Sequence, residues 1–590
     1  IRKDGMETVS YIYSYSSLYP IAEIKGATYA EMKSFLGTTT LENIENAPNP
    51  TRQDLEGLRT RLLPYSNPIL MTGYLYKTGI GINTIMTSNG YVTEYLYDGF
   101  NRLSKSLDSE GKETSNVVYH YGEDGNKIET TVMLDATGGR KTFRTTLHDG
   151  LGRPVQIVTD ALGESGRYTT TRMAYEGLET ICREWLPVEC GNDCRIMDEQ
   201  EIETLADETY CDRMAYTTNH TDVLGRKEIS IGPGQVWYAS DKKVEKEYLV
   251  NKEREVKRYY APDDGSYSLE QKGYYEPSTL RVTKTTDEDG RVSLVYTDMQ
   301  ERKILERRTD GTLDLDTYYI YDDKGNLRFV LSPEYQKSGY KAIFGYEYRY
   351  DNRGNILKKF LPQSSYVQYW YDSADRLKYM QDARMREKGL YRFFLYDNLS
   401  RPVVQGLCRT CKRDKSPVTA TFNAQDSGFQ GTGYTLSSET GIEDVELETI
   451  NYYDRYTFME NRQIMLPDLL RQYCDTMAIG LTSQYEGHSQ GMATATLVRT
   501  EAGEMLPEVY CYDDKGRHVL TLSLYPENRL LSETTTYTFT DNPETIHYTL
   551  FKSEERTDVL LKTGYTAYSD KPKEKRIKVW DNKGLNDEEK

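Results

Sequence analysis

Short stretches of alternating polar and apolar residues recur along most of the chain. One of them is Val92-Thr93-Glu94-Tyr95-Leu96-Tyr97, which is followed by turn-forming residues and then by another apolar stretch. Successive side chains of a β-strand point to opposite faces, so this alternation predicts strands with one apolar or aromatic face and one polar face. A spacing of roughly two dozen residues fits two strands and their connections. The pattern therefore predicts consecutive β-hairpins.

A turn motif stands between the strands of most hairpins: Tyr-Asp, three turn residues, and then Arg or Asn. Seven Tyr-Asp dipeptides occur, with clear copies at residues 97–103, 321–327 and 350–356. Asp can accept a hydrogen bond from the backbone two residues on, and Gly can adopt the positive φ of a tight reversal. The residues predicted to form these turns are Asp98, Asp149, Asp222, Asp298, Asp322, Asp351, Asp372, Asp397, Asp513, Gly152, Gly225, Gly325, Gly354 and Gly516.

The repeat extends beyond its clearest copies. His148, Thr221 and Thr297 replace the Tyr in some turns, and weaker copies are expected at Asp454, Glu486 and Asp541. One hairpin cannot bury its apolar face alone, so neighbouring hairpins are expected to pair edge to edge. The sequence therefore predicts a mainly β fold built as one long continuous sheet.

Two helical patterns interrupt the repeat near the N-terminus. Residues 27–36 contain helix-forming residues and end at Gly37, while residues 51–63 place Leu55, Leu58 and Leu62 on one face. They predict a small helical insertion at about 27–63. The expected organisation is degenerate repeats with this insertion at 1–90, repeats at 91–176, a Cys-rich insertion at 177–220, and repeats at 221–590 that continue past the C-terminal end.

Six of the eight cysteines form two groups. The Cys-rich insertion contains Cys182, Cys190, Cys194 and Cys211. Two disulfides are favoured here if the protein is exported, a zinc site is less favoured because no C-x-x-C spacing occurs, and reduced cysteines remain open for a cytosolic protein. Cys408 and Cys411 form a C-x-x-C motif within β-repeat sequence, where a local disulfide or two ordinary thiols are favoured over redox chemistry.

Composition narrows the class of protein. Only 37% of the 590 residues are hydrophobic, but 52 are Tyr. A Tyr ring packs across strands while its hydroxyl reaches water or a carbonyl, so this composition suits half-buried sheet faces and disfavours disorder. The net charge of −18 argues against nonspecific nucleic-acid binding. No apolar run is long enough to span a membrane.

The sequence gives little indication of a catalytic site. The six histidines form no H-E-x-x-H motif, and no phosphate-binding Gly-rich loop with its Lys occurs. Carboxylates are abundant, but turn geometry explains the Asp residues of the repeat, and a glycosidase-type acid/base pair is disfavoured. We therefore expect a protein that is not an enzyme and has no metal or cofactor.

The repeat resembles the YD repeats of the rearrangement-hotspot (RHS) family. This family includes bacterial polymorphic toxins, the C components of insecticidal toxin complexes and animal teneurins. The resemblance lies in residues 149–156, 321–327 and 371–377, and these phrases are similar to those of RHS proteins of Bacteroidota. It implies a β-sheet strip that curls into a hollow shell, which often encloses a C-terminal toxin or an unfolded polypeptide.

The resemblance implies a non-enzymatic shell segment of a large exported protein, at the bacterial surface or outside the cell. Its expected partner is its own C-terminal effector or toxin region, or another polypeptide. Three alternatives stay open: a cell-surface adhesin whose exposed aromatic rings bind glycans, a structural subunit of an outer-membrane or secretion assembly, and a hydrolase with converging carboxylates.

Overall fold

Consecutive strands pair with one another along almost the whole chain. The computed structural model describes residues 2–3, 7–65, 67–122, 126–160, 168–177, 180–191, 195–262, 267–309, 312–552, 555–565 and 572–581. Its main sheet has 36 strands. Strand after strand pairs antiparallel with its neighbours in the sequence, as the alternation predicts. The predicted mainly β fold of hairpins in one long sheet is confirmed.

The strands of the first part of the sheet lie between residues 2 and 231. They are β1 (Arg2–Lys3), β2 (Glu7–Ser14), β3 (Tyr19–Lys25), β4 (Leu70–Lys77), β5 (Gly81–Met86), β6 (Val92–Tyr97), β7 (Leu103–Leu107), β8 (Glu113–His120), β9 (Asn126–Met133), β10 (Lys141–His148), β11 (Pro154–Thr159), β12 (Tyr168–Glu176), β13 (Thr180–Trp185), β14 (Val188–Cys190), β15 (Tyr216–Thr221) and β16 (Lys227–Ile231).

The strands of the second part follow the same antiparallel plan. They are β17 (Lys243–Val250), β20 (Arg281–Thr286), β21 (Val292–Thr297), β22 (Lys303–Thr309), β23 (Asp314–Tyr321), β24 (Leu327–Leu331), β25 (Gly345–Tyr350), β26 (Ile356–Phe360), β27 (Tyr366–Tyr371), β28 (Leu377–Gln381), β29 (Tyr391–Tyr396), β30 (Pro402–Cys408), β33 (Glu446–Tyr453), β34 (Ala493–Arg499), β35 (Met505–Tyr512), β36 (His518–Tyr525), β37 (Arg529–Tyr537), β38 (Pro543–Lys552), β39 (Glu555–Tyr565) and β40 (Pro572–Asp581).

Two short hairpins stand apart from the main sheet. β18 (Lys257–Tyr260) pairs with β19 (Glu270–Tyr274), and β31 (Ala420–Phe422) pairs with β32 (Tyr434–Leu436). Neither hairpin interrupts the main sheet, because β17 pairs directly with β20 and β30 pairs directly with β33.

Strand pairing also continues through the predicted Cys-rich segment at 177–220. One end of β12 pairs with β13 and the other end pairs with β14, and β13 then pairs with β15. Between β14 and β15 lies a helix, α4 (Glu199–Tyr210), whose N-terminus is capped by Asp198 and Glu201. The segment is therefore part of the sheet, with one helical excursion.

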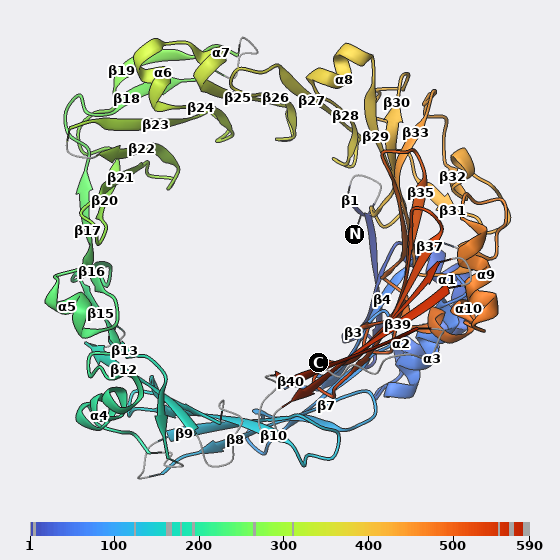
Figure 1. Cartoon of the computed structure of the whole chain (residues 1–590), viewed down its shortest axis with the longest axis horizontal. Helices are drawn as coiled ribbons and strands as arrows, with labels where there is room; N and C mark the ends of the chain where they lie inside the picture. The colour runs from blue at the N-terminus through green and yellow to red at the C-terminus, as the bar shows by residue number, and fades with distance from the viewer. Residues whose placement is uncertain are drawn as a thin grey trace.

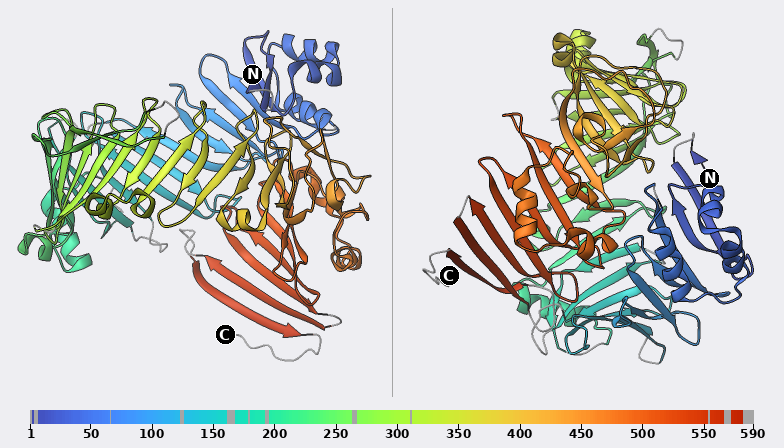
Figure 2. Two further views of the ribbon diagram at one scale, coloured as in Figure 1. Left: turned by 90° about the horizontal axis from the view of Figure 1, so that it is seen from above. Right: turned by 90° about the vertical axis from the view of Figure 1, so that its right-hand side faces the viewer.

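The sheet curls into a ring. In Figure 1 successive strands are placed one after another around the ring, and the helices lie on the outer side of the ring. In the views of Figure 2 the last strands, in orange and red, lie beside the first ones rather than in line with them. The strip therefore advances as a spiral, a shape that accumulates from the twist between neighbouring strands.

Three helices form the insertion that the sequence predicts near the N-terminus. α1 (Tyr29–Leu36) and α3 (Arg52–Leu62) both begin with a capping box, at Thr28 and Thr51. α1 ends at Gly37 as predicted. α2 (Thr38–Asn46) was not predicted, because its run of Thr residues disfavours a helix; the burial of Leu41 against β2 overrides that preference.

The other helices are short and cover the outer face of the sheet. They are α5 (Gln235–Ala239), α6 (Pro333–Ser338), α7 (Lys341–Phe344), α8 (Ala383–Lys388), α9 (Asp468–Thr476) and α10 (Leu481–Tyr485).

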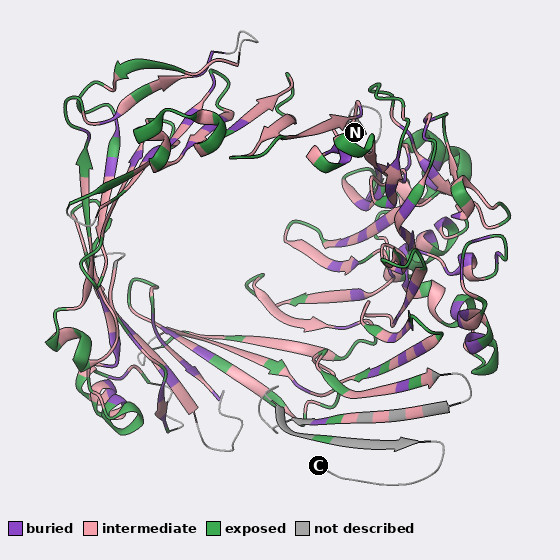
Figure 3. Cartoon of the chain, turned by 45° about the horizontal axis from the view of Figure 1, so that its top comes forward, coloured by how far each residue is buried: buried purple, intermediate pink, exposed green. Residues whose placement is uncertain are grey.

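Buried side chains gather in four clusters along the strip (Figure 3). The largest contains residues of β28–β37 together with Leu470 and Tyr473 of α9. A second joins β2–β5 to α1–α3, with Leu55, Leu58 and Leu62 all buried as their spacing predicts. Each cluster lies between the sheet and the elements outside it, as expected for an additive repeat fold.

Candidate functional site

Each repeat turn is organised by the carboxylate of its Asp. In the turn at Asp149, Oδ1 accepts hydrogen bonds from the N–H groups of Leu151 (2.9 Å) and Arg153 (3.0 Å), while Oδ2 accepts one from Nε of Arg153 (2.8 Å). The backbone closes the turn, because Asp149 N–H donates to the Arg153 carbonyl and Gly152 N–H donates to the Asp149 carbonyl. The Asp149 side chain therefore accepts hydrogen bonds from two backbone N–H groups and holds the side chain of Arg153 in place.

The same two backbone hydrogen bonds to Oδ1 are present in every turn named from the sequence: Asp98, Asp149, Asp222, Asp298, Asp322, Asp351, Asp372, Asp397 and Asp513. Two further turns, at Asp108 and Asp287, have the same geometry and were missed. They lack the preceding Tyr, but their Asp-x-x-Gly spacing could have identified them.

The fourth residue of the turn has a positive φ. Gly152, Gly225, Gly325, Gly354 and Gly516 occupy this place, with φ between 77° and 87°. In other turns the place is taken by Asn101, Glu301, Asp375 or Ser400, with φ near 60°. The register shifts by one residue next to the turn, which makes the hairpin a tight reversal with a bulge.

Three of the weaker copies differ from the predicted turn. Glu486 lies in a 3-10 helix rather than in a turn, so that assignment was wrong. In the turn near Asp541 the first residue is Thr538, and Asp541 holds the positive-φ position. Asp454 opens a long excursion that contains α9 and α10 before β34.

The turns differ in their electrostatics. Hydrogen bonds from the backbone N–H and then from the side chain of Arg102 hold the pKa of Asp98 below its usual value. The Arg226 side chain lowers the pKa of Asp222 in the same way. Asp397 is the exception: it is buried, and burial raises its pKa despite its contacts with Arg401.

The Tyr and Arg of the motif link each hairpin to the preceding one. The Tyr350 hydroxyl donates to the carbonyl of Leu327, directly after the previous turn (2.8 Å), and the Tyr396 hydroxyl donates likewise to Leu377 (2.8 Å). The guanidinium of the previous turn lies over the next ring, as for Arg376 and Tyr396 (5.0 Å to the ring centroid). The motif therefore couples one repeat to the next.

In β23 to β27 the Tyr residues of the motif face the inside of the ring. Ile320 and Phe329 pair across β23 and β24 and belong to the core against which Tyr335 of α6 packs, so they point outwards. Alternation then directs Tyr319 and Tyr321 inwards. Residues that stand opposite each other on neighbouring strands share a face of the sheet. The strand pairings from β23 to β27 therefore place the following residues on the inner face: Tyr319, Tyr321, Tyr346, Tyr348, Tyr350, Tyr369 and Tyr371.

Residues far apart in sequence meet where the spiral returns to its beginning. We call this contact, between residues 26–90 and residues 398–516, the seam. Its hydrogen bonds join side chains to backbone carbonyls: Arg59 to Gly487 (2.7 Å), Ser88 to Gln490 (3.3 Å), Asn89 to Asp514 (3.0 Å), Asn398 to Pro68 (2.9 Å) and Arg455 to Tyr65 (3.0 Å). These pairs are 330 to 428 residues apart.

Glycine permits close approach at the seam. A Cβ on Gly26 would stand 2.5 Å from the Pro68 carbonyl oxygen and 2.8 Å from a methyl group of Leu399. A Cβ on Gly516 would lie 3.2 Å from Nδ2 of Asn89. Across the seam, the backbone of each part therefore lies against a side chain of the other, Gly26 against Leu399 and Gly516 against Asn89.

A buried charge network supports the seam from one side. Arg401 donates to both carboxylate oxygens of Asp454 (3.0 and 2.6 Å) and, through Nε, to Asp397 (2.7 Å). The next residue after each of these carboxylates, Asn398 and Arg455, makes a seam hydrogen bond. The network thus fixes two of the residues that close the ring.

Three cysteines of the predicted Cys-rich segment lie at different places in the fold. Cys190 is buried beside α4, Cys182 lies half-buried on β13 and Cys211 is exposed at the end of α4. Cys182 and Cys211 are free thiols, and Cys194 lies outside the described residues. The predicted pairing of these cysteines stays a prediction.

Cys408 and Cys411 lie within hydrogen-bonding reach of each other. This hydrogen bond, together with burial, raises the pKa of the Cys408 thiol, whereas the same bond lowers the pKa of Cys411. Both are free thiols in the structure.

The described part of the chain contains no group of three or more His, Cys, Asp or Glu residues with metal-binding geometry. His518 packs against the rings of Tyr510 and Tyr512, as expected for a histidine in an aromatic position. Within the described residues, none of the helices is both long enough and apolar enough to cross a membrane.

Comparison with known proteins gave matches to solved structures alone. No family model matches the sequence, and no curated protein matches it. A crystal structure of TcdB2-TccC3 has a TM-score of 0.47 and 11% identity, covering 86% of this chain and 26% of that chain. A structure of TcdB2-TccC3-TEV has a TM-score of 0.49 and 9% identity, covering 97% and 31%. The chain thus spans less than a third of these structures.

Proposed function

We propose that this chain is a non-enzymatic segment of a hollow β-shell of the RHS type, within a large exported protein. The shell acts at the bacterial surface or outside the cell, and it encloses the C-terminal effector polypeptide of the same protein. It has no catalytic residues of its own, and its Asp residues serve the turns.

The observation that carries this proposal is the seam. The seam bonds the strip to itself across at least 330 residues of sequence, so the curled sheet is held as a ring. The helices on the outer side leave the inner face to the strands. A closed wall with an uncovered inner face suits enclosure of another polypeptide.

The inner face supports the same proposal. Its Tyr rings offer apolar surface, and their hydroxyls offer hydrogen-bonding groups, to an extended chain. Such a surface holds a polypeptide without demanding one sequence.

Protease protection tests the proposal. A flexible, protease-sensitive polypeptide is fused after Lys590, and its cleavage is followed over time by gel electrophoresis. We expect the fused polypeptide to survive much longer than the same polypeptide free in solution. Equal cleavage rates for the fused and free polypeptides would contradict enclosure.

A matched pair of variants connects protection to the seam. Arg455→Ala removes a guanidinium–carbonyl hydrogen bond across the seam, whereas Arg529→Ala removes a local one to Pro526 (3.1 Å). We expect faster cleavage of the fused polypeptide in the first variant and wild-type protection in the second.

A further inference from the structure

Two thiols lie together at the end of strand β30. Cys408 is the last residue of β30 and is 0% exposed, whereas Cys411 is half-buried and is followed by exposed residues, 412–416. The two side chains lie within hydrogen-bonding reach of each other. The pair therefore combines one thiol inside the core with one that small molecules can reach.

The backbone holds the two cysteines on a fixed turn. The Arg409 N–H donates to the Glu443 carbonyl (3.1 Å), and the Lys412 N–H donates to the Thr440 carbonyl (2.8 Å). These bonds attach both sides of the turn to the segment 440–443. Because the turn is attached on both sides, the two sulfurs stay close together without a covalent bond between them.

Positive charge lies beside Cys411. The hydrogen bond with Cys408, and then the nearby side chains of Arg413 and Lys378, lower the pKa of the Cys411 thiol, although burial opposes them. The same hydrogen bond, together with burial, raises the pKa of Cys408. The thiolate is the reactive form of a cysteine. Cys411 is therefore the thiol that ionises, and Cys408 keeps its proton and donates the hydrogen bond.

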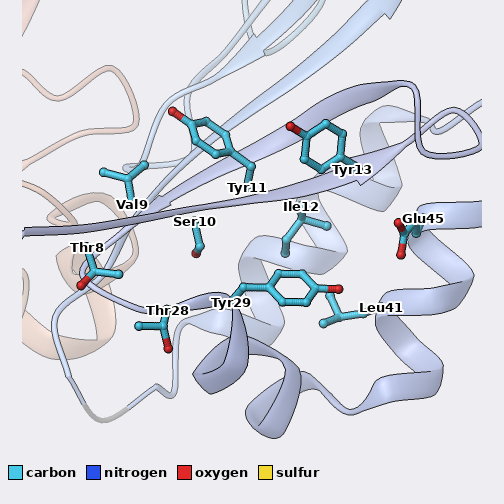
Figure 4. Close-up of a pocket in the computed structure, with 10 residues that line it drawn as sticks. All are labelled: Thr8, Val9, Ser10, Tyr11, Ile12, Tyr13, Thr28, Tyr29, Leu41 and Glu45. Carbon is cyan, nitrogen blue, oxygen red and sulfur yellow. The ribbon is translucent and has the colours of Figure 1, made fainter. Parts of the chain in front are cut away.

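A buried hydroxyl lies near the two sulfurs. Tyr379 is 1% exposed, and its hydroxyl has no hydrogen-bond partner among the described residues. Ser10 shares both properties, but it lines a pocket of about 440 Å³ that water can enter (Figure 4). Burial, and then the neighbouring sulfurs of Cys411 and Cys408, raise the pKa of Tyr379, so it stays a neutral O–H donor. Such a donor can stabilise a thiolate at this site.

We infer that Cys408 and Cys411 form a thiol–disulfide exchange site, which reacts with low-molecular-weight disulfides and closes into a disulfide of its own. Cys411 makes the first attack because it is the thiol that a small molecule can reach, and Cys408 lies behind it to complete the exchange. The site involves neither the seam nor the enclosed polypeptide, so the inference does not depend on the proposed function.

The exchange takes place in two steps. The Cys411 thiolate attacks one sulfur of the small disulfide, whose S–S bond breaks and releases one thiolate. That thiolate takes the proton of Cys408, and the Cys408 sulfur then attacks the Cys411 sulfur of the mixed disulfide and releases the second thiolate. The two cysteines together lose two electrons, and the small disulfide is reduced to two thiols. The reaction is stoichiometric, since the site must be reduced before it reacts again.

Equilibration of the whole chain with glutathione and glutathione disulfide tests the exchange. Free thiols are then blocked with N-ethylmaleimide, and the disulfides are mapped by peptide mass spectrometry. Trypsin cuts after Arg409, between the two cysteines, so a Cys408–Cys411 disulfide joins two peptides. We expect the joined peptides in oxidising mixtures and their loss in reducing ones. Absence of this disulfide at every ratio would overturn the inference.

Cys474 and Cys511 give a control within the same protein. They are near enough for Cys474 to affect the pKa of Cys511, but both are buried. Burial raises the pKa of both thiols, to about 11 for Cys474. We therefore expect no Cys474–Cys511 disulfide in the mixtures that close Cys408–Cys411. Equal formation of the two disulfides would show that the Cys408–Cys411 site has no special reactivity and would overturn the inference.

The order of attack is tested by alkylation of the wild-type protein. We expect iodoacetamide to modify Cys411 at least about tenfold faster than Cys408. With an aromatic disulfide, Cys408→Ser should retain a mixed disulfide on Cys411, whereas Cys411→Ser should leave Cys408 unmodified. Faster alkylation of Cys408 would overturn the assigned roles. If either variant does not fold, as judged by circular dichroism, the wild-type alkylation rates decide the outcome.

A matched pair of arginine variants tests the role of the positive charge. Arg413 lies close enough to Cys411 to lower its pKa, whereas Arg409 donates to the Lys388 carbonyl (3.0 Å). We expect Arg413→Gln to slow alkylation of Cys411 about threefold, and Arg409→Gln to leave the rate unchanged. Equal rates in the wild type and both variants would overturn the assignment of Cys411 as the attacking thiolate.

Discussion

At the scale of single residues, the repeated Asp is a turn residue. Its carboxylate accepts backbone hydrogen bonds and holds the Arg or Asn four residues later, as in the turn from Asp372 to Arg376. Those contacts use the lone pairs that a general acid or base would need. The recurrence of this Asp therefore follows from hairpin geometry.

Replacement of a turn glycine should damage folding more than replacement of a histidine. Gly325 has φ of +86°, and a Cβ there would meet only Arg302 Nη1 at 3.8 Å, so strain in the backbone is the main cost of a side chain at this position. We expect Gly325→Val to lower the free energy of unfolding by about 2 kcal/mol, and Gly354→Val to act alike. Urea unfolding measures the change.

Two controls accompany this prediction. Asn tolerates positive φ, as Asn101 does in an equivalent turn, so Gly325→Asn should cost less than about 1 kcal/mol. His220→Ala, at an exposed position, should change stability by no more than about 0.5 kcal/mol. A histidine substitution that costs as much as Gly325→Val would contradict the assigned role of the turn.

The turn carboxylates also predict acid sensitivity. The pKa values of Asp98 and Asp222 are lower in the folded protein than the usual value near about 4 in an unfolded chain. Their stabilising effect is therefore present above about pH 4 and is lost as the pH falls through the lowered values. Asp397, whose pKa is raised, acts in the opposite direction.

We expect the melting temperature to fall steeply below about pH 4. Differential scanning calorimetry at a series of pH values measures it. Asp222→Asn removes one of the responsible carboxylates, so its melting temperature should depend less on pH than that of the wild type. An unchanged dependence would show that the turn at Asp222 does not contribute.

At the scale of elements, each hairpin is bonded to the hairpin before it by more than the strand ladder. The Tyr hydroxyl caps a carbonyl just beyond the previous turn, and the Arg of that turn covers the Tyr ring. Stability of the strip should therefore depend on contacts between neighbouring repeats.

Tyr350→Phe tests this link. It removes the hydrogen bond to the Leu327 carbonyl while keeping the ring, and burial raises the pKa of Tyr350 to about 12, in line with an enclosed hydroxyl. We expect a loss of about 1 kcal/mol in the free energy of unfolding. Tyr346→Phe on the same strand face serves as the control, because Tyr346 is 38% exposed; little change is expected there.

The elements also show what the sequence can and cannot predict. Strands and turns followed from alternation and from the Asp and Gly positions, since both are local properties. Two helices, α2 and α4, were not predicted. α2 forms because its packing against the sheet outweighs the low helix propensity of its residues. α4 lies in a segment that was interpreted only by its cysteines. The seam could not be predicted at all, because it depends on curvature summed over more than 300 residues.

At the scale of the whole molecule, the seam converts a strip into a closed ring. It is held by side chains that reach backbone carbonyls, and it rests on the buried network of Asp397, Arg401 and Asp454. Charged groups of this kind are costly to leave without a partner. Closure of the ring is therefore expected to be sensitive to the loss of any one charged residue of this network.

Asp454→Asn should weaken the whole fold. It removes a carboxylate from Arg401 in a buried site, so we expect a loss of about 3 kcal/mol in the free energy of unfolding. Asp541→Asn is the matched control: its φ of 67° resembles the 69° of Asp454, but its ion pair with Arg517 is more exposed. The control should cost less than about 1 kcal/mol.

The most direct test of the closed ring is cross-linking across the seam. Ser88→Cys and Gln490→Cys are combined in a protein whose exposed Cys211 is replaced by Ser, and a short bis-maleimide is added. Ser88→Cys with Ser338→Cys, on the far side of the ring in Figure 1, is the control pair. The closed ring predicts rapid intramolecular cross-linking of the first pair alone, seen as a faster-migrating band in denaturing electrophoresis. Equal, slow reaction of both pairs would contradict it.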